Sequence, residues 1–187
     1  MIKFRHGNPA MSTLSTPVGA RDHSVGPAQA PITIVEYGDF QCSHSGRAYL
    51  VVKALQQRIG MRLRFAFRNF PIVELHPRSL VAAEAAEAAA SQGRFWKMHD
   101  LLFENQRALG AAALDRYARA LELDMGRFTD DMNEHTFRSR IQADVETGVM
   151  SGVEGTPTFF INGVRYEGAH DLVSLLAASV AVGPEAR

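Results

Sequence analysis

The sequence contains one cysteine, Cys42, so no disulfide can form within the chain, and stability does not require an oxidising compartment. A surplus of either charge is missing as well, because 20 lysines and arginines balance 20 aspartates and glutamates. The chain therefore lacks the positively charged surface that would attract nucleic acid or an anionic membrane, and we expect neither as a partner. A metal site built from the protein alone is not expected, since the seven histidines are not closely paired and no second thiol is present.

Long apolar runs are absent too, and none approaches the length of a membrane span. The first seven residues carry charge without a following apolar core, which is not the pattern of a signal peptide. We therefore expect a cytoplasmic location, although a sequence trimmed of its signal would read the same way. With 46% hydrophobic and 21% charged residues, the 187 residues suffice for one domain that carries an insertion.

The N-terminal part of the chain predicts a leader followed by a βαβ unit. Residues 1–22 are rich in Ser, Thr, Pro and Gly without periodicity, and we expect a mobile leader there. A nearly continuous β-branched and apolar stretch at 32–37 predicts a buried strand, and 62–68 predicts a second one. Between them, apolar residues recur at helical spacing from 42 to 59. Residues 23–76 are thus expected to form the first part of an α/β domain.

The rest of the chain predicts a helical insertion and a return to the domain. Residues 77–153 show only helix signals, which indicates an inserted helical subdomain. Residues 154–187 predict a β-hairpin around the Asn-Gly turn at 162–163, followed by a last helix. The predicted order is βαβ, helical insert, ββα.

The lone cysteine stands where the first buried strand passes through a turn into a helix. A helix start favours an ionised thiolate, because its amides and dipole stabilise negative charge. Ser43 leaves its N–H available, His44 adds positive charge when protonated, and Ser45 lies one turn on, so that its hydroxyl faces the sulfur. Cys42 is therefore a candidate nucleophile. An inert, buried cysteine is the alternative, and the polar neighbours favour the reactive interpretation.

A second motif, Gly155-Thr156-Pro157, directly precedes the apolar strand of the hairpin. If the Thr156–Pro157 bond is cis, the backbone groups of Thr156 face outward and can pair with an extended peptide. On its own, this motif indicates no more than a turn.

Together, the cysteine at a helix start and the Gly-Thr-Pro-Thr-Phe-Phe-Ile-Asn-Gly stretch at 155–163 resemble the thioredoxin superfamily. The helical insert, with the segments at 35–42 and 64–71, resembles its DsbA-like branch. The resemblance implies an α/β, thioredoxin-like fold, a cis Pro157 beside Cys42, and Cys42 as the attacking thiol. It also implies that Glu36 is the family's buried acid near the active site, whereas a strand-edge carboxylate is the alternative from the sequence alone.

The chain departs from the family at the second position of the redox motif, where Ser45 replaces the expected cysteine. A single thiol can form a mixed disulfide with a substrate, but an external thiol must release it. We expect a thiol-disulfide oxidoreductase acting on protein or small-molecule thiols and disulfides, with no cofactor and with glutathione as a candidate co-substrate. The candidate site comprises a nucleophile with two tuning residues, two substrate-orienting residues and two supporting residues: Cys42, Ser45 and His44; Thr156 and Pro157; Glu36 and Ser43.

A non-enzymatic interpretation stays open beside this one. Ser45 also fits a redox-inactive thioredoxin fold that binds extended peptides or a protein partner, and a serine at this position is a common replacement for trapping substrate complexes. A homodimer is a candidate assembly, because helical inserts of this size often bury an apolar face against a second copy.

Overall fold

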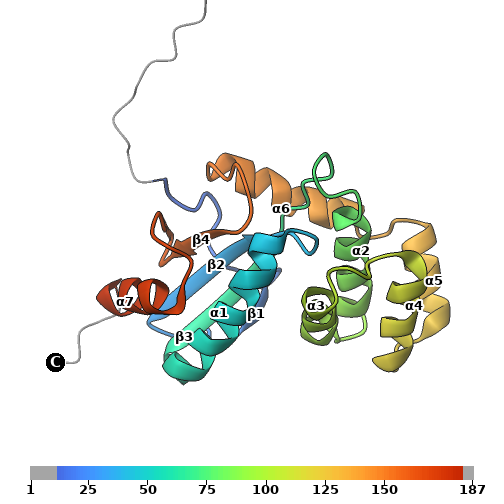
Figure 1. Cartoon of the computed structure of the whole chain (residues 1–187), viewed down its shortest axis with the longest axis horizontal. Coiled ribbons are helices and arrows are strands. Elements are labelled where there is room, and N and C mark those ends of the chain that lie inside the picture. Colours follow the sequence, from blue (N-terminus) through green and yellow to red (C-terminus); the bar gives the residue numbers. More distant parts are fainter. Residues whose placement is uncertain (1–11, 183–187) are drawn as a thin grey trace, which may run out of the picture.

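The computed structural model describes residues 12–182 and contains one five-stranded sheet in the order β1-β3-β2-β4-β5 (Figure 1). Strands β2 and β3 are parallel and joined by helix α1, which confirms the predicted βαβ unit. Strand β1 pairs antiparallel with β3 at one edge, while β4 pairs antiparallel with β2. The strands are β1 (His23–Val25), β2 (Ile32–Gly38), β3 (Leu63–Asn69), β4 (Thr158–Ile161) and β5 (Val164–Arg165).

Local sequence explains the central strands and the hairpin. Strands β2 and β3 are buried along almost their whole length, as their β-branched and aromatic residues favour. Asn162 and Gly163 connect β4 to β5 with φ angles of 48° and 83°. Two successive positive φ values are what a tight hairpin turn needs, and Asn-Gly supplies them at low cost.

Helices cover both faces of the sheet. On one face, α1 and α7 pack on a large core, to which the helical insert also contributes. On the other face, a smaller core around Tyr37 and Phe160 is covered by α6 and by residues near position 14. The helices are α1 (Ser43–Ile59), α2 (Ser79–Ala90), α3 (Phe95–Glu104), α4 (Ala111–Ala120), α5 (Met125–Asn133), α6 (Arg138–Met150) and α7 (Leu172–Val182), with a 3₁₀ turn at Gly60–Arg62. Within residues 12–182, no helix is long and apolar enough to cross a membrane.

The segment between β3 and β4 is helical, as predicted. Helices α2 to α5 gather beside the sheet domain (Figure 1), and the alanines of α2 are buried between α3 and α5. Helix α6 leaves this group and returns to the sheet, where Gly148 lies so close to Phe70 that a Cβ atom there would crowd the ring. The helical insert is therefore anchored to the sheet domain through α6.

Residues 12–22 of the predicted leader contact the sheet domain, and the mobility of the leader stays a prediction; residues 1–11 lie outside the described residues. The Leu14 amide donates to the Gly163 carbonyl at 2.8 Å. Arg68, which is almost fully buried, donates to the Asp22 carboxylate at 2.7 Å and to the Thr16 carbonyl at 3.0 Å. The charge of Arg68 needs these partners in the interior, and they hold the segment on the domain.

The Asp22–Arg68 pair makes the attachment of this segment measurable. Burial opposes ionisation of Asp22, but hydrogen bonds from Arg68 and the Gly19 amide outweigh it and hold the pKa of the carboxyl below its usual value. We expect Asp22→Ala to lower the free energy of unfolding by about 3 kcal/mol, because it leaves a buried guanidinium without its counter-charge. Urea denaturation measures this effect.

The matched control is Asp115→Ala, which removes a carboxylate from an exposed pair with Arg119. Exposed pairs contribute little, so a loss below about 0.5 kcal/mol is expected there. Equal losses in the two variants would contradict the burial argument.

Candidate functional site

Cys42 occupies the N-cap position of α1, four residues after the end of β2. Its backbone is extended, with φ −68° and ψ 120°, and its carbonyl accepts the Gly46 amide at 3.0 Å in the first turn of the helix. The turn before it depends on Gly38, because a Cβ atom there would overlap the Phe67 ring. The expected helix start at the cysteine is thus present, although none of the described first-turn amides donates a hydrogen bond to the sulfur.

The sulfur of Cys42 faces the turn before β4. Cys42 Sγ donates to the Thr156 carbonyl at 3.3 Å, although the two residues are 114 positions apart. The Thr156–Pro157 bond is cis, in agreement with the resemblance. Only 5% of Cys42 is exposed, so the cysteine is buried in the folded protein.

The neighbours of Cys42 differ in part from the prediction. Ser45 is fully buried, and its hydroxyl accepts the Asp39 amide at 3.4 Å. Between the described side chains of Ser45 and Cys42 no hydrogen bond is formed while the sulfur is a thiol that donates to Thr156, and donation from Ser45 to the thiolate stays a prediction. The buried amide of Asp39 requires an acceptor, and Ser45 supplies it.

His44 and Ser43 are both exposed at the start of α1. The Arg47 guanidinium donates to His44 Nδ1 at 2.8 Å. Arg47 thus places a second cationic side chain at the start of α1, and a positive charge on His44 stays a prediction. His170 lies near His44, and burial followed by the charge of His44 holds the pKa of His170 below its usual value.

Asp39 is a supporting residue that the sequence pattern did not reveal. Its side chain is buried and accepts the Gln41 amide at 2.8 Å, the Ile72 amide at 2.9 Å and His76 Nδ1 at 2.9 Å. It therefore fixes the turn that carries Cys42 against the segment after β3. In the sequence, Asp39 follows Gly38 at the end of a predicted strand and His76 stands before Pro77. Local patterns cannot show that these two distant residues meet.

A cleft lies beside the cysteine turn. It has a volume of about 780 Å³ and is lined by Gln41, Ser43 and residues 103–108, in the segment from the end of α3 toward α4. Gln106 Nε2 donates to the Phe40 and Cys42 carbonyls at 2.9 Å each, which ties the helical insert to the cysteine turn. A substrate that reaches the sulfur from this side would contact both parts of the protein.

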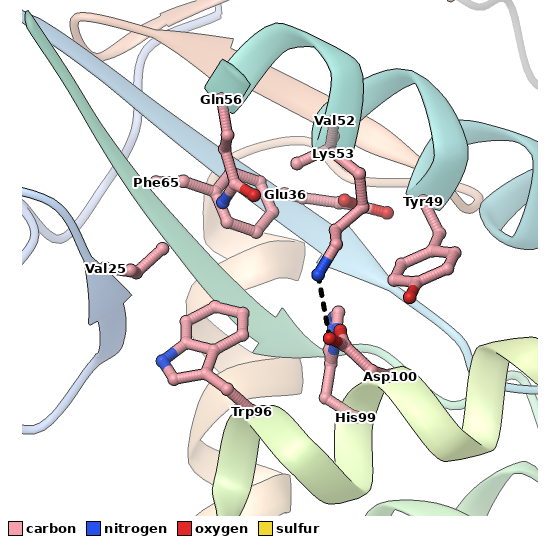
Figure 2. A pocket seen from close by; sticks show the side chains of 10 residues that line it. All are labelled: Val25, Glu36, Tyr49, Val52, Lys53, Gln56, Phe65, Trp96, His99 and Asp100. Carbon is pink, nitrogen blue, oxygen red and sulfur yellow. Dashed lines mark hydrogen bonds and ion pairs between the residues drawn. The ribbon is translucent and has the colours of Figure 1, made fainter. Parts of the chain in front are cut away.

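Glu36 is buried on β2, with 2% of its surface exposed. Burial raises the pKa of its carboxyl from 4.5 to about 8, so the group is largely protonated at neutral pH. Its Oε1 atom has no hydrogen-bond partner within the described residues. The carboxyl lines a cavity between α1 and α3 whose walls do not include Cys42 (Figure 2). Glu36 is thus a buried acid, and not a strand-edge carboxylate.

Comparison with known proteins agrees with this geometry. A family model described as Thioredoxin matches residues 19–178. The chain belongs to the thioredoxin family. BdbD from Bacillus subtilis superposes with a TM-score of 0.78 at 21% identity, over 86% of this chain and 92% of that one. For alpha-DsbA1 from Wolbachia pipientis the TM-score is 0.78 at 21% identity, over 90% of this chain and 94% of that one. A thioredoxin-like oxidoreductase from Silicibacter pomeroyi superposes with a TM-score of 0.75 at 26% identity, over 86% of this chain and 91% of that one. The fold of this thioredoxin-family chain is therefore that of the DsbA-type proteins.

The curated relatives are much longer than this chain. The Na⁺/H⁺ antiporter NhaA 3 from Salinispora tropica is 44% identical over 167 residues, which cover 89% of this chain and 26% of the antiporter. The antiporter NhaA from Herminiimonas arsenicoxydans is 39% identical over 156 residues, with coverages of 83% and 25%. The chain thus spans about a quarter of the length of the curated relatives it matches.

The protonated Glu36 predicts a pH dependence of stability. Folding raises the pKa of this carboxyl from 4.5 in the unfolded chain to about 8. Its contribution to the free energy of unfolding is therefore complete below pH 4.5 and is lost as the pH rises toward 8. Glu36→Gln keeps the neutral shape at every pH. We therefore expect the free energy of unfolding of Glu36→Gln to rise relative to wild type by a few kcal/mol between about pH 5 and pH 8.

Urea denaturation at several pH values measures this difference. Glu146→Gln, on the exposed face of α6, is the control and should show a constant difference from wild type. A pH-independent difference for Glu36→Gln would mean that the carboxyl is ionised in the folded protein.

Proposed function

We propose that this chain is a thiol-disulfide oxidoreductase that works through one thiol, Cys42. The observation that carries the proposal is the placement of Cys42 Sγ at the N-cap of α1, 3.3 Å from the Thr156 carbonyl and beside the cis Pro157. A helix N-terminus stabilises the thiolate that attacks, and the half-buried Thr156 just before β4 offers backbone groups to an extended substrate.

The reaction has two exchange steps at Cys42 and a third in solution. The Cys42 thiolate attacks one sulfur of a substrate disulfide, which forms a mixed disulfide on Cys42 and releases the other substrate sulfur as a thiolate. No second cysteine exists in the chain to displace the bound half. A low-mass thiol such as glutathione attacks the mixed disulfide and regenerates the Cys42 thiolate. A second such thiol frees the remaining substrate half, so two glutathione thiols are oxidised for each disulfide reduced.

The surrounding residues have distinct parts in this proposal. Before attack, the Cys42 thiol loses to solvent the proton that it donates to the Thr156 carbonyl, and the first-turn amides of α1 stabilise the negative charge of the sulfur. Thr156 then becomes free to pair with the substrate backbone. Asp39 holds the turn in place, and Arg47 adds positive charge at the helix start. We place the reaction in the cytoplasm, where low-mass thiols are kept reduced.

Replacement of Cys42 tests the proposal directly. With glutathione as reductant and a glutathionylated peptide as substrate, Cys42→Ala should lose essentially all turnover, since no other thiol is present. The rate of glutathione disulfide production measures this. Equal turnover in the variant and the wild type would exclude this site.

A second cysteine should change the reaction type. In Ser45→Cys, the new thiol stands one turn from Cys42, so it can resolve the mixed disulfide and reduce a substrate disulfide without added glutathione. Ser43→Cys is the matched control, because its side chain is exposed and adjacent to Cys42 in sequence but not one turn away. A single-turnover gain in both variants, or in neither, would contradict the geometry proposed for the resolving position.

A second candidate function is a binding module that serves an antiporter. The 44% identity to one part of the Salinispora tropica antiporter favours it, as does the small exposed fraction of Cys42, 5%. Vesicles that hold this antiporter without its matching segment provide the probe. Binding of the chain with unchanged affinity in Cys42→Ala supports this function, and absence of binding excludes it.

A further inference from the structure

The cleft beside the cysteine turn is large enough for a small peptide. Its volume is about 780 Å³, which lies within the usual range of small-molecule sites. It reaches the cysteine turn, because Ser43 directly follows Cys42 and lines the cleft. On the opposite wall, the Gln106 side chain donates to the Cys42 carbonyl at 2.9 Å. A molecule in the cleft therefore lies next to the residue that carries the sulfur.

The charged side chains in the lining of the cleft are Glu104 and Arg107, three positions apart where α3 ends. Both are exposed, so a ligand can reach them. The Tyr49 hydroxyl donates to Glu104 Oε1 at 3.0 Å and holds this carboxylate at the wall, with Oε2 left as an acceptor. Arg107 forms no ion pair with another described residue, so its guanidinium donors remain available to a ligand.

A second guanidinium lies at the edge of the cleft. Arg78 Nη1 is 2.9 Å from the position that a Cβ atom on Gly110 would take, two residues beyond the lining. The Arg78 amide donates to the side chain of Gln41, which lines the cleft, at 2.6 Å. This side of the molecule thus presents two cations, Arg78 and Arg107, and one carboxylate, Glu104.

This charge pattern distinguishes between low-mass thiols. A ligand with two carboxylates and one ammonium group would find a partner for each of its charges, whereas a thiol without them would gain nothing from these side chains. The planar guanidinium can donate two parallel hydrogen bonds to a carboxylate, which adds geometric specificity. Glutathione has these three charged groups, and its γ-glutamyl end carries a carboxylate and the ammonium on the same carbon atom.

We propose that this cleft binds a net-anionic peptide thiol of the glutathione type. The γ-glutamyl carboxylate pairs with Arg107 and the ammonium with Glu104, while the glycine carboxylate pairs with Arg78 and the sulfur faces the cysteine turn. The assignment rests on the proposed function, since it specifies the thiol that releases the mixed disulfide from Cys42. Binding itself involves no exchange of sulfur, so the two proposals can be tested separately.

Calorimetric titration with S-methylglutathione tests the site, because the methylated sulfur cannot form a disulfide. We expect saturable binding to the wild-type protein that weakens as the ionic strength rises. S-methyl-cysteinylglycine keeps the sulfur and the glycine carboxylate but lacks the γ-glutamyl group, and it should bind about fivefold more weakly. Absence of saturable binding of S-methylglutathione would overturn the proposal, and equal affinities for the two compounds would overturn the γ-glutamyl assignment.

Two variants and a control complete the test. Arg107→Ala and Glu104→Gln each remove one charge, and the glutamine keeps an acceptor for Tyr49. Each should weaken S-methylglutathione about fivefold and leave S-methyl-cysteinylglycine unchanged. Arg58→Ala removes an exposed arginine about 23 Å from the start of α1 and should change neither affinity. Equal weakening of both compounds in the two cleft variants would contradict the assignment.

The outcome also separates this proposal from the proposed function. Binding of S-methylglutathione without turnover at Cys42 would support the cleft and contradict the oxidoreductase reaction. Turnover at Cys42 without such binding would support the reaction and overturn the cleft as the glutathione site.

Discussion

The antiparallel pairing of β2 with β4 is the constraint on which the candidate site depends. Tyr37 pairs with Thr158, so the end of β2 lies beside the start of β4. Cys42 follows β2 by one tight turn, and Thr156-Pro157 precedes β4 directly. The register thus places two segments more than a hundred residues apart within hydrogen-bond distance. A slip of one residue would turn every side chain of β4 to the other face and separate the sulfur from the Thr156 carbonyl.

Buried polar groups keep this arrangement rigid. Asp39 joins the cysteine turn to the segment after β3 through two backbone amides and His76. Gln106 joins the same turn to the helical insert. Each of these groups would be costly without its partners, so the partners are held in one geometry. The insert is therefore part of the frame of the site, and its contacts reach the helix start at which the sulfur lies.

The sequence was sufficient for features that depend on neighbouring residues. The apolar run of β2, the helix start at Cys42 and the Asn-Gly hairpin each have a local cause. The cis bond before Pro157 was implied by the family resemblance. Contacts across the fold could not be predicted in this way. Asp39 and His76 are 37 positions apart, and Arg68 and its partner Asp22 are 46 positions apart. Ser45 has the expected helical spacing from Cys42, but its acceptor role toward the Asp39 amide depends on a buried turn that the spacing does not reveal.

The central claim is that the sulfur of Cys42 is poised for exchange in the folded protein although only 5% of the residue is exposed. Intact-mass measurement of the native chain with oxidised glutathione tests this most directly, with the urea-unfolded chain as reference. The account predicts that the folded protein gains one glutathione at Cys42 faster than the unfolded chain does, and that reduced glutathione removes it. An adduct that forms only after unfolding would contradict the account.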